Sequence, residues 1–417
     1  MEVNDTGRNE AGTQQEASTG KTTRLHYLDW LQVLAILGVF LFHAVHPFDD
    51  LADWHIKNVE KSVMATFYAG FFNLWGMPFF FLMAGATSWF SLRRRTPGRY
   101  ARERVTRLLI PFIVGSIVLT PIQAYYEARH KGWWEGDSLI DFIFSSEARN
   151  YFYTEYNPIT FGPEIFADLG YHLWFVGFLF VYALIALPVF TWLNGDSGKR
   201  SVAPFAELAK RRGGLLIFTI PLILIGFFFQ PFLSGYTGWA SFLYLLVFFI
   251  FGYMLIADQF FMDAIRRDWW LHLILGIACT LFFFSVAAGV PVWDWLVSPG
   301  MPEFYVSWIA WGINSWCWSM VMMYVGMRFL DYTNTTLKYS REASYPFFFF
   351  HQPVIILIAF YVVQWQVSLP IKILVVLIGA FTVTLAIYEL LVRRINPVRA
   401  LFGMKARMNW VICGKIN

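Results

Sequence analysis

Ten stretches of about twenty apolar residues recur along the chain, and they constrain its fold more than any other feature. Helices of this length can cross a hydrocarbon core of about 30 Å. Because lipid offers the backbone no hydrogen-bond partners, such stretches cross it as helices. We therefore predict an all-α polytopic bundle of about ten transmembrane helices. The predicted spans are residues 27–48, 64–91, 106–125, 172–193, 214–232, 236–256, 269–290, 304–327, 344–364 and 369–392.

The composition agrees with this class, because 57% of the residues are hydrophobic and only 14% are charged. The long second span is predicted to break near Gly76-Met77-Pro78. The three cysteines are far apart, so they predict neither a disulfide framework nor a metal site. No internal repeat is visible, which gives no support to the related halves of many secondary transporters.

Loop charges predict how the bundle is oriented. Residues 93–107 carry seven Arg and one Glu, and residues 195–213 carry five basic and two acidic residues. Residues 126–171 have eight acidic and three basic residues, and residues 49–61 have four acidic and two basic. The positive-inside rule then predicts that both termini are cytoplasmic.

The chain divides into three parts on composition. Residues 1–23 are polar and are predicted to form a disordered cytoplasmic tail. Residues 24–395 form the predicted transmembrane domain, and residues 396–417 a basic cytoplasmic tail.

A polar stripe runs along the first span. Gln32 and His43 are eleven residues apart, which returns to within about 20° of the same helix face. Asp29 and Gln32 form an i,i+3 pair, so all three side chains share that face. At 1.5 Å per residue, His43 lies about 21 Å beyond Asp29. Such a stripe is expected to face the bundle interior or a wet cavity, although a lone histidine can also simply bond a neighbouring helix.

Two further histidines lie inside predicted spans. His351 is in the ninth span, followed by Pro353, which frees a backbone carbonyl nearby. A ninth helix that begins at residue 344 places His351 about 9 Å below His43, so we expect no direct contact between them. His172 lies where the fourth span begins, close to Trp174.

Charged groups lie at the span ends, and each has a simpler interpretation. Arg104 and Arg107 share one face at the inner end of the third span, where arginines also serve topology alone. Glu389 is about one turn inside the last span and pairs with Arg393 at i+4 in the simpler interpretation.

A buried histidine is biased toward its neutral form, and neutral imidazole can take a proton from an alcohol as that alcohol attacks a carbonyl group. The chain has no G-x-S-x-G elbow, P-loop, H-E-x-x-H or C-x-x-C motif. We therefore expect proton abstraction inside a membrane cavity, with no permanently bound cofactor and no metal.

These residues lie in motifs that resemble the acyltransferase-3 family of integral membrane O-acyltransferases. The resemblance covers about Arg24 to Lys405. The matching motifs, in order, are "LDWL" followed by His43, "PFFFLMAGATSWF", "RVTRLLIP", "HLWFVG", "SYPFFFFHQPVI" and "YELLVRR". Within the family the chain is most similar to members that succinylate periplasmic glucans, which share the Trp54-His55 pair.

The resemblance implies an acyl-CoA donor from the cytoplasm and a carbohydrate or other hydroxyl acceptor beyond the membrane. It also implies a multi-pass protein of the bacterial inner membrane, which contacts the lipid bilayer and no nucleic acid. The expected catalytic residues are His43, Asp29 and His351. The expected substrate-binding residues are Gln32, Arg104, Arg107, His172, Trp174 and Glu389. Guanidinium groups suit the phosphates of coenzyme A.

One position departs from the family pattern. The family carries Arg eleven residues before the first-span histidine, where this chain has Gln32. Glutamine keeps hydrogen-bonding capacity but loses the charge, so Asp29 is expected to pair with Arg24 or with an arginine of the third span instead. A catalytically silent family member and a secondary transporter are the two alternatives.

Overall fold

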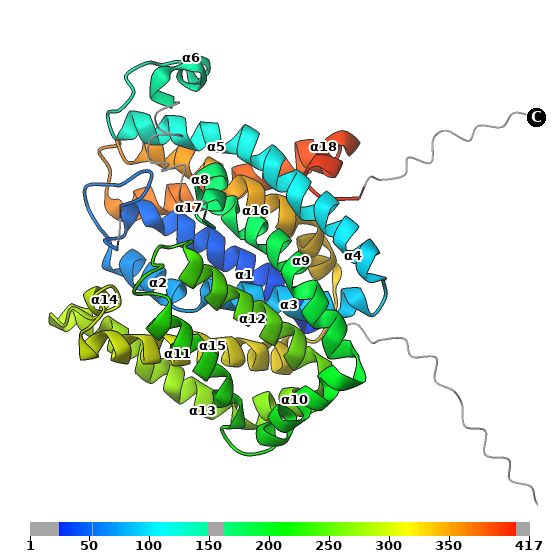
Figure 1. Cartoon of the computed structure of the whole chain (residues 1–417). Coiled ribbons are helices and arrows are strands. Elements are labelled where there is room, and N and C mark those ends of the chain that lie inside the picture. Colours follow the sequence, from blue (N-terminus) through cyan, green and yellow to red (C-terminus); the bar gives the residue numbers. More distant parts are fainter. Residues whose placement is uncertain (1–24, 52, 149–161, 406–417) are drawn as a thin grey trace, which may run out of the picture.

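The computed structural model describes residues 25–51, 53–148 and 162–405, and this part of the chain contains helices and no strand. The predicted all-α polytopic class is therefore confirmed, and the protein is a multi-pass membrane protein. Figure 1 shows the long helices running roughly alongside one another, with α4 and α18 toward one end and α14 toward the other.

The helices and helical turns have the following bounds: α1 (His26–Val45), η1 (His46–Phe48), α2 (Val63–Asn73), α3 (Gly76–Leu92), α4 (Pro97–Arg104), η2 (Val105–Leu109), α5 (Ile110–His130), α6 (Leu139–Phe144), α8 (Ile165–Gly170), η3 (Tyr171–Leu173), α9 (Trp174–Asn194), α10 (Asp196–Ala209), η4 (Gly214–Phe218), α11 (Thr219–Phe228), α12 (Trp239–Ala257), α13 (Gln259–Phe284), η5 (Ser285–Ala288), α14 (Val292–Trp295), α15 (Pro302–Phe329), α16 (Thr335–Val362), α17 (Leu369–Ile387), η6 (Tyr388–Val392) and α18 (Asn396–Leu401).

Eight helical segments in the described residues are long and apolar enough to cross a membrane. They coincide with eight of the ten predicted spans. The remaining two predicted spans are also helical. The span at 214–232 is the shorter apolar helix Gly214–Phe228, and the span at 304–327 is α15, which has 28 residues but is rich in Trp, Ser and Tyr.

The predicted break in the second span is confirmed. Helix α2 ends at Asn73 and α3 begins at Gly76, so Leu74 and Trp75 separate them. Pro78 falls in the first turn of α3, where its missing N–H group interrupts no intrahelical hydrogen bond.

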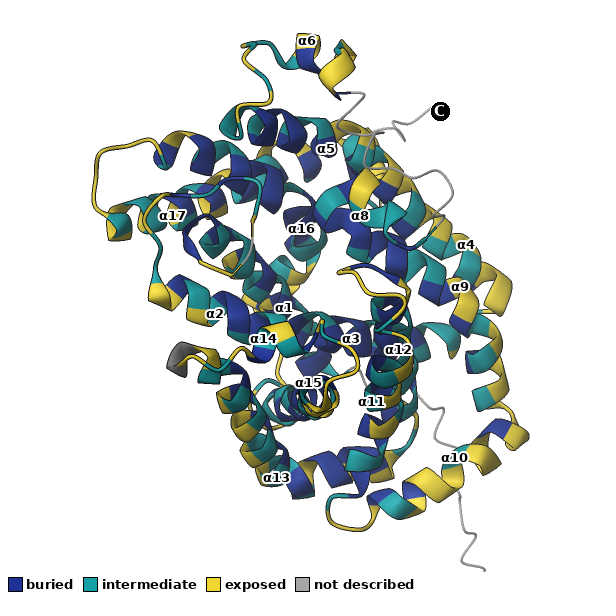
Figure 2. Cartoon of the chain, turned by 60° about the vertical axis from the view of Figure 1, so that its left-hand side comes forward, coloured by how far each residue is buried: buried dark blue, intermediate teal, exposed yellow. Residues whose placement is uncertain are grey.

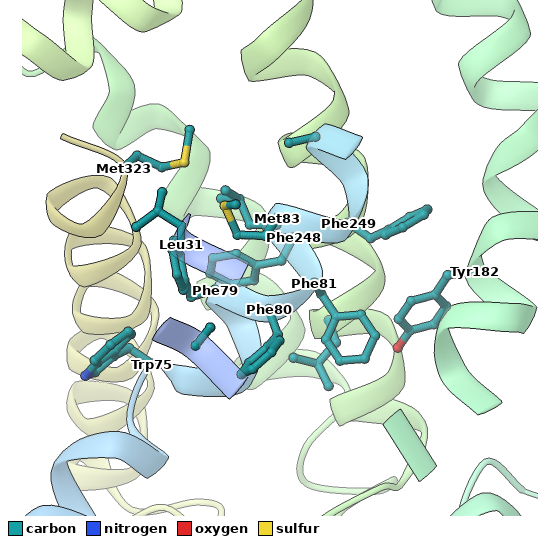
Figure 3. Packing of buried hydrophobic residues seen from close by; sticks show 14 of the residues in the cluster. Leu31, Trp75, Phe79, Phe80, Phe81, Met83, Tyr182, Phe248, Phe249 and Met323 are labelled. Atoms are coloured by element: carbon teal, nitrogen blue, oxygen red, sulfur yellow. The ribbon is translucent and has the colours of Figure 1, made fainter. Parts of the chain in front are cut away.

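The central helices pack through aromatic side chains. Figure 3 shows Phe79, Phe80 and Phe81 of α3 among residues of α9, α12 and α15. Glycines allow α3 and α12 to approach closely, because a Cβ atom on Gly85 would overlap the carbonyl oxygen of Phe249 and one on Gly252 would overlap that of Leu82.

Burial separates central helices from peripheral ones. Within an apolar stretch of 18 residues in each membrane segment, 72% of the residues are buried in α16 and 67% in α2–α3. The corresponding share is 22% in Leu369–Val392. Figure 2 shows the same contrast between the buried interior and the exposed surface of α10.

Segments with the same predicted sidedness lie at the same end of the bundle. Lys131 at the end of α5 pairs with Asp53 at 2.9 Å, and the N–H group of Lys57 donates to Nε2 of His130 at 3.1 Å. At the other end, Tyr345 donates to the carbonyl oxygen of Arg107 at 2.6 Å. We call the end that holds Asp53 and Lys131 the acidic end, and the end that holds Arg107 and Tyr345 the basic end.

Two predicted boundaries are shifted. The predicted spans leave a connection between residues 256 and 269, but α13 begins at Gln259, so the charged residues Asp263, Arg266, Arg267 and Asp268 are helical. Residues 396–405, assigned to the basic tail, pack against the body: Arg399 is 5% exposed and donates to Glu342 at 3.1 Å.

Candidate active site

The first-span and ninth-span histidines meet directly. Nδ1 of His43 lies 2.8 Å from Nε2 of His351. The prediction that the two rings are separated by about 9 Å is therefore wrong. It assumed that the ninth helix begins at residue 344, whereas α16 begins at Thr335. His351 is thus about 24 Å and His43 about 26 Å from the start of its own helix.

Hydrogen bonds determine which ring nitrogen of His43 is free. Nδ1 of His351 lies 2.6 Å from the carbonyl oxygen of Phe348, so it must carry the proton and donate. In the neutral ring, Nε2 of His351 then accepts from Nδ1–H of His43. His43 is left with an unprotonated Nε2, which is the atom that a general base needs. The side chain of His43 is partly exposed.

The proline in α16 provides the support for the third histidine. Pro353 has no N–H group, so the carbonyl oxygen of Phe349, four residues earlier, lacks its helical donor. Nε2 of His172 donates to that oxygen at 3.1 Å. Nδ1 of His172 is then an acceptor, and it is buried without a hydrogen-bond partner among the described residues. The ring centroids of His172 and His351 are 5.2 Å apart.

The loop after α1 covers the histidines from the acidic end. The ring of Trp54 stacks on His43 at 6.5 Å and on His46 at 5.4 Å. Asp49 anchors this loop through His46 and through Lys57, whose Nζ is 2.7 Å away. Burial alone would raise the pKa of Asp49, but hydrogen bonds from His46 and Lys57 hold it below the ordinary value for Asp.

Sequence reasoning missed a second polar cluster beside the histidines. Nδ1 of His55 lies 2.5 Å from a carboxylate oxygen of Glu127, and Lys131 lies 2.8 Å from the other. The amide nitrogen of Gln352, next to His351 in sequence, is 3.3 Å from Nε2 of His55. Glu127 is only 6% exposed, yet from sequence it counted merely as one of the acidic loop charges. A pattern extending α5 to residue 130 would have placed it within a helix.

A large cavity of about 680 Å³ opens at the basic end. Asp29, Gln32, Arg104 and Arg107 all line it, so the structure brings together four predicted site residues. Sequence reasoning missed the other charged lining residues, which lie in α16 and in or after α18. They are Lys338, Arg341, Glu342, Arg399 and Lys405. Six basic and two acidic described residues therefore face this cavity, which makes it attractive to anions.

Arg104 lies at the junction of α4 with a π-helical turn, η2. Its guanidinium carbon is 4.4 Å from the ring centroid of Tyr100, and its Nε is buried with no partner among the described residues. Single π turns are frequent at functional sites. An arginine with an unused donor on a cavity wall is suited to bind an anion.

The structure does not bring all predicted site residues to the histidines. Asp29 is about 21 Å from His43 along α1 and pairs instead with Arg341, at 3.4 Å. The expected partners were Arg24, which lies outside the described residues, or a third-span arginine. Both carboxylate oxygens of Glu389 accept hydrogen bonds from Nη1 of Arg393 at 2.8 Å, as the simpler interpretation of Glu389 predicted. Glu389 lines neither the cavity at the basic end nor the smaller cavity described next.

A second, much smaller cavity lies beside the histidines. It has a volume of about 20 Å³ and is lined by His43, His172, Trp174 and Asn73 together with aromatic and apolar side chains. We call it the histidine chamber.

Within the described residues, no group of three or more His, Cys, Asp or Glu side chains is arranged to hold a metal ion.

The model of the family described as "Acyltransferase domain" matches residues 25–389, nearly the whole described chain. The chain belongs to the acyltransferase-3 family. Similar proteins include glucans biosynthesis protein C of Salmonella paratyphi A and of Salmonella agona, each 24% identical over 206 residues, or 47% of each chain. The same protein of Salmonella heidelberg is 25% identical over 197 residues, 45% of this chain and 44% of the relative.

The match therefore spans less than half of the length of these relatives. No solved structure matches this acyltransferase-3 family member.

Proposed function

We propose that this protein is a membrane O-acyltransferase that moves a short acyl group from cytoplasmic acyl-CoA to a hydroxyl group of an envelope carbohydrate. The observation that carries the proposal is the chain of hydrogen bonds from Phe348 through His351 to His43, which leaves one nitrogen of His43 free as a base. Family membership supports acyl transfer, and the relatives' name supports a glucan acceptor.

The cavity at the basic end is the proposed donor site. Coenzyme A carries several phosphate charges, and Arg104, Arg107 and the nearby Lys338 offer both fork-shaped and point-charge partners for them. The cavity continues along α1 past Ile36 to Phe348, one turn from His351. This continuity supports a route by which the thioester arm approaches the histidines from the basic end.

Written as a direct transfer, the reaction uses His43 as general base. The acceptor's hydroxyl oxygen attacks the thioester carbonyl carbon while its proton passes to Nε2 of His43. A carbon–oxygen ester bond forms, and the carbon–sulfur bond breaks with its electron pair going to sulfur. The imidazolium returns the proton to the thiolate, so the products are the ester and coenzyme A, and His43 is neutral again.

His351 and His172 have supporting roles in this proposal. His351 accepts the hydrogen bond from Nδ1–H of His43 and so fixes the tautomer of His43, which makes His351 a positioning residue. His172 presents an unpaired acceptor nitrogen beside these rings and is a substrate-binding residue in this proposal. Basic segments at the donor end agree with a cytoplasmic donor side and with residence in a bacterial inner membrane.

The test measures transfer of a radiolabelled acetyl or succinyl group from the corresponding acyl-CoA to carbohydrate in isolated membranes. We expect transfer by the wild type and a loss of about 10²-fold or more for His43→Ala. The matched control is His272→Ala, because His272 is a buried histidine of another membrane segment, α13, where Nδ1 is 3.0 Å from the carbonyl oxygen of Asp268. Full activity in a folded His43→Ala variant would overturn the proposed mechanism.

A further inference from the structure

The donor cavity and the histidine chamber share two aromatic side chains. Phe175 of α9 and Phe348 of α16 line both cavities. Their ring centroids are 5.7 Å apart at an interplanar angle of 62°. The rings therefore form a partition between the 680 Å³ cavity at the basic end and the chamber beside His43.

Phe348 is also tied to the catalytic histidines. Its ring centroid is 5.5 Å from that of His351 and 5.7 Å from that of His172. Its carbonyl oxygen accepts the hydrogen bond from Nδ1–H of His351. Phe348 thus lies between the donor cavity and the histidines.

The chamber beyond the partition is small. Its volume of about 20 Å³ is far below the 680 Å³ of the donor cavity. A chamber of this size favours a short acyl group, because a longer chain would require its walls to move.

The chamber wall also carries no cation that could pair with a negative charge. Of the described residues that line it, none is Lys or Arg, and most are aromatic or aliphatic. The side chains of Asn73, Trp174 and Tyr236 carry neutral N–H or O–H donors. A carboxylate placed in such surroundings loses its hydration and meets no positive charge that would offset this loss.

We infer that the histidine chamber is the subsite for the acyl group, and that Phe175 and Phe348 restrict the transferred group to a small, uncharged acyl group such as acetyl. Resting on the proposed function, this inference adds the residues that select the donor. It sets this chain apart from an enzyme that transfers succinyl, whose two additional carbons end in a carboxylate.

The test compares acetyl-, butyryl- and succinyl-CoA as donors for wild-type membranes, with the ester identified after mild base release. We expect acetyl transfer to exceed succinyl and butyryl transfer at least about tenfold, since even one methylene is discriminated about 10- to 200-fold in a fitted pocket. Succinyl transfer equal to or faster than acetyl transfer would overturn the inference and leave the acyltransferase function intact. Absence of transfer from all three donors would instead refute the proposed function and the inference with it.

A variant pair tests the partition itself. Phe348→Ala should join the chamber to the donor cavity and raise the ratio of butyryl to acetyl transfer at least about tenfold. The matched control is Phe350→Ala on the same helix, because Phe350 lines neither cavity and packs on Phe402 at 4.8 Å. An unchanged ratio in a folded Phe348→Ala variant, or an equal change in the control, would mean that the aromatic rings are packing residues only.

Discussion

Replacing His351 by alanine tests whether the hydrogen bond between the two helices has a role in catalysis. The variant removes the acceptor for Nδ1–H of His43, which lies 2.8 Å from Nε2 of His351 in the wild type. His43 can then place its proton on Nε2 instead, where it blocks the base. Alternatively, it keeps the active tautomer with an unpaired, buried N–H group.

The expected loss follows from that unpaired group. Leaving a buried donor without an acceptor costs about 1–3 kcal/mol, and each 1.36 kcal/mol is tenfold in rate. His351→Ala should therefore lower kcat by about 5- to 150-fold. His43→Ala removes the base itself and should cost about 10²- to 10⁴-fold. Glutamine at position 351 keeps an acceptor oxygen, so His351→Gln should restore part of the lost activity.

The decisive assay is a double-variant cycle on purified protein, with acetyl transfer followed at saturating acetyl-CoA and folding checked by size exclusion. Because His351 acts through His43, the double alanine variant should be no slower than His43→Ala alone. Losses that multiply in the double variant would show that His351 acts independently. A wild-type rate for His351→Ala would show that the hydrogen bond has no part in catalysis.

Three other changes test the donor cavity and the covering loop. Arg104→Ala should raise the KM for the acyl-CoA donor about tenfold or more with little change in kcat, because phosphate contacts are present in both ground and transition states. The control Arg99→Ala should leave this KM unchanged, because Arg99 is exposed and lies outside the donor cavity. Gln32→Leu should lower activity by the equivalent of about 1–3 kcal/mol and Gln32→Arg should be tolerated beside Asp29; a wild-type rate for Gln32→Leu would exclude this position from the site. Asp49→Asn should lower the free energy of unfolding by about 1.5–3 kcal/mol at neutral pH, measured by thermal unfolding. Because folding lowers the pKa of Asp49, its stabilisation is complete above the ordinary carboxyl pKa of about 3.9 and is lost as the pH falls through the lower folded value, so the variant and the wild type should converge in acid; a constant gap would contradict this.

The sequence predicted the helices well because their signal is local. Length and hydropathy give each span without knowledge of its neighbours, and all ten predicted positions are helical in the structure. The shared face of Asp29 and Gln32 also follows from helix geometry alone, and both residues line one cavity with Arg104 and Arg107.

The contact between His43 and His351 could not be predicted from the sequence, because it depends on where each of the two helices begins. The hydropathy pattern predicts that the ninth helix begins at residue 344, because the residues before it are polar and resemble a loop. In the structure those residues continue the helix by nine positions to Thr335, and Lys338 and Arg341 face the donor cavity from this added part. An error of nine residues in a helix start is about 14 Å in depth, enough to separate two rings that are bonded.

Glu127 shows the same dependence on tertiary contacts. In the positive-inside rule, Glu127 counts as one acidic loop charge whether or not it is buried. Composition therefore cannot distinguish a solvated carboxylate from one bonded to His55 and Lys131. Only packing against the loop that carries His55 brings the pair together.

The arrangement explains how a membrane helix can hold an ionisable ring deep in its interior. A neutral His43 needs one partner for its N–H group and leaves one nitrogen without a proton. The partner is a second neutral histidine, which is itself held by the backbone of Phe348, so the chain of donors ends on a carbonyl oxygen and no charge is buried at rest. A carboxylate in place of His351 would hold the same tautomer more strongly, but it would bring a buried negative charge into the bundle, with a desolvation cost of several kcal/mol. A histidine–histidine pair thus sets the proton position needed for a base while keeping the site neutral until substrate arrives.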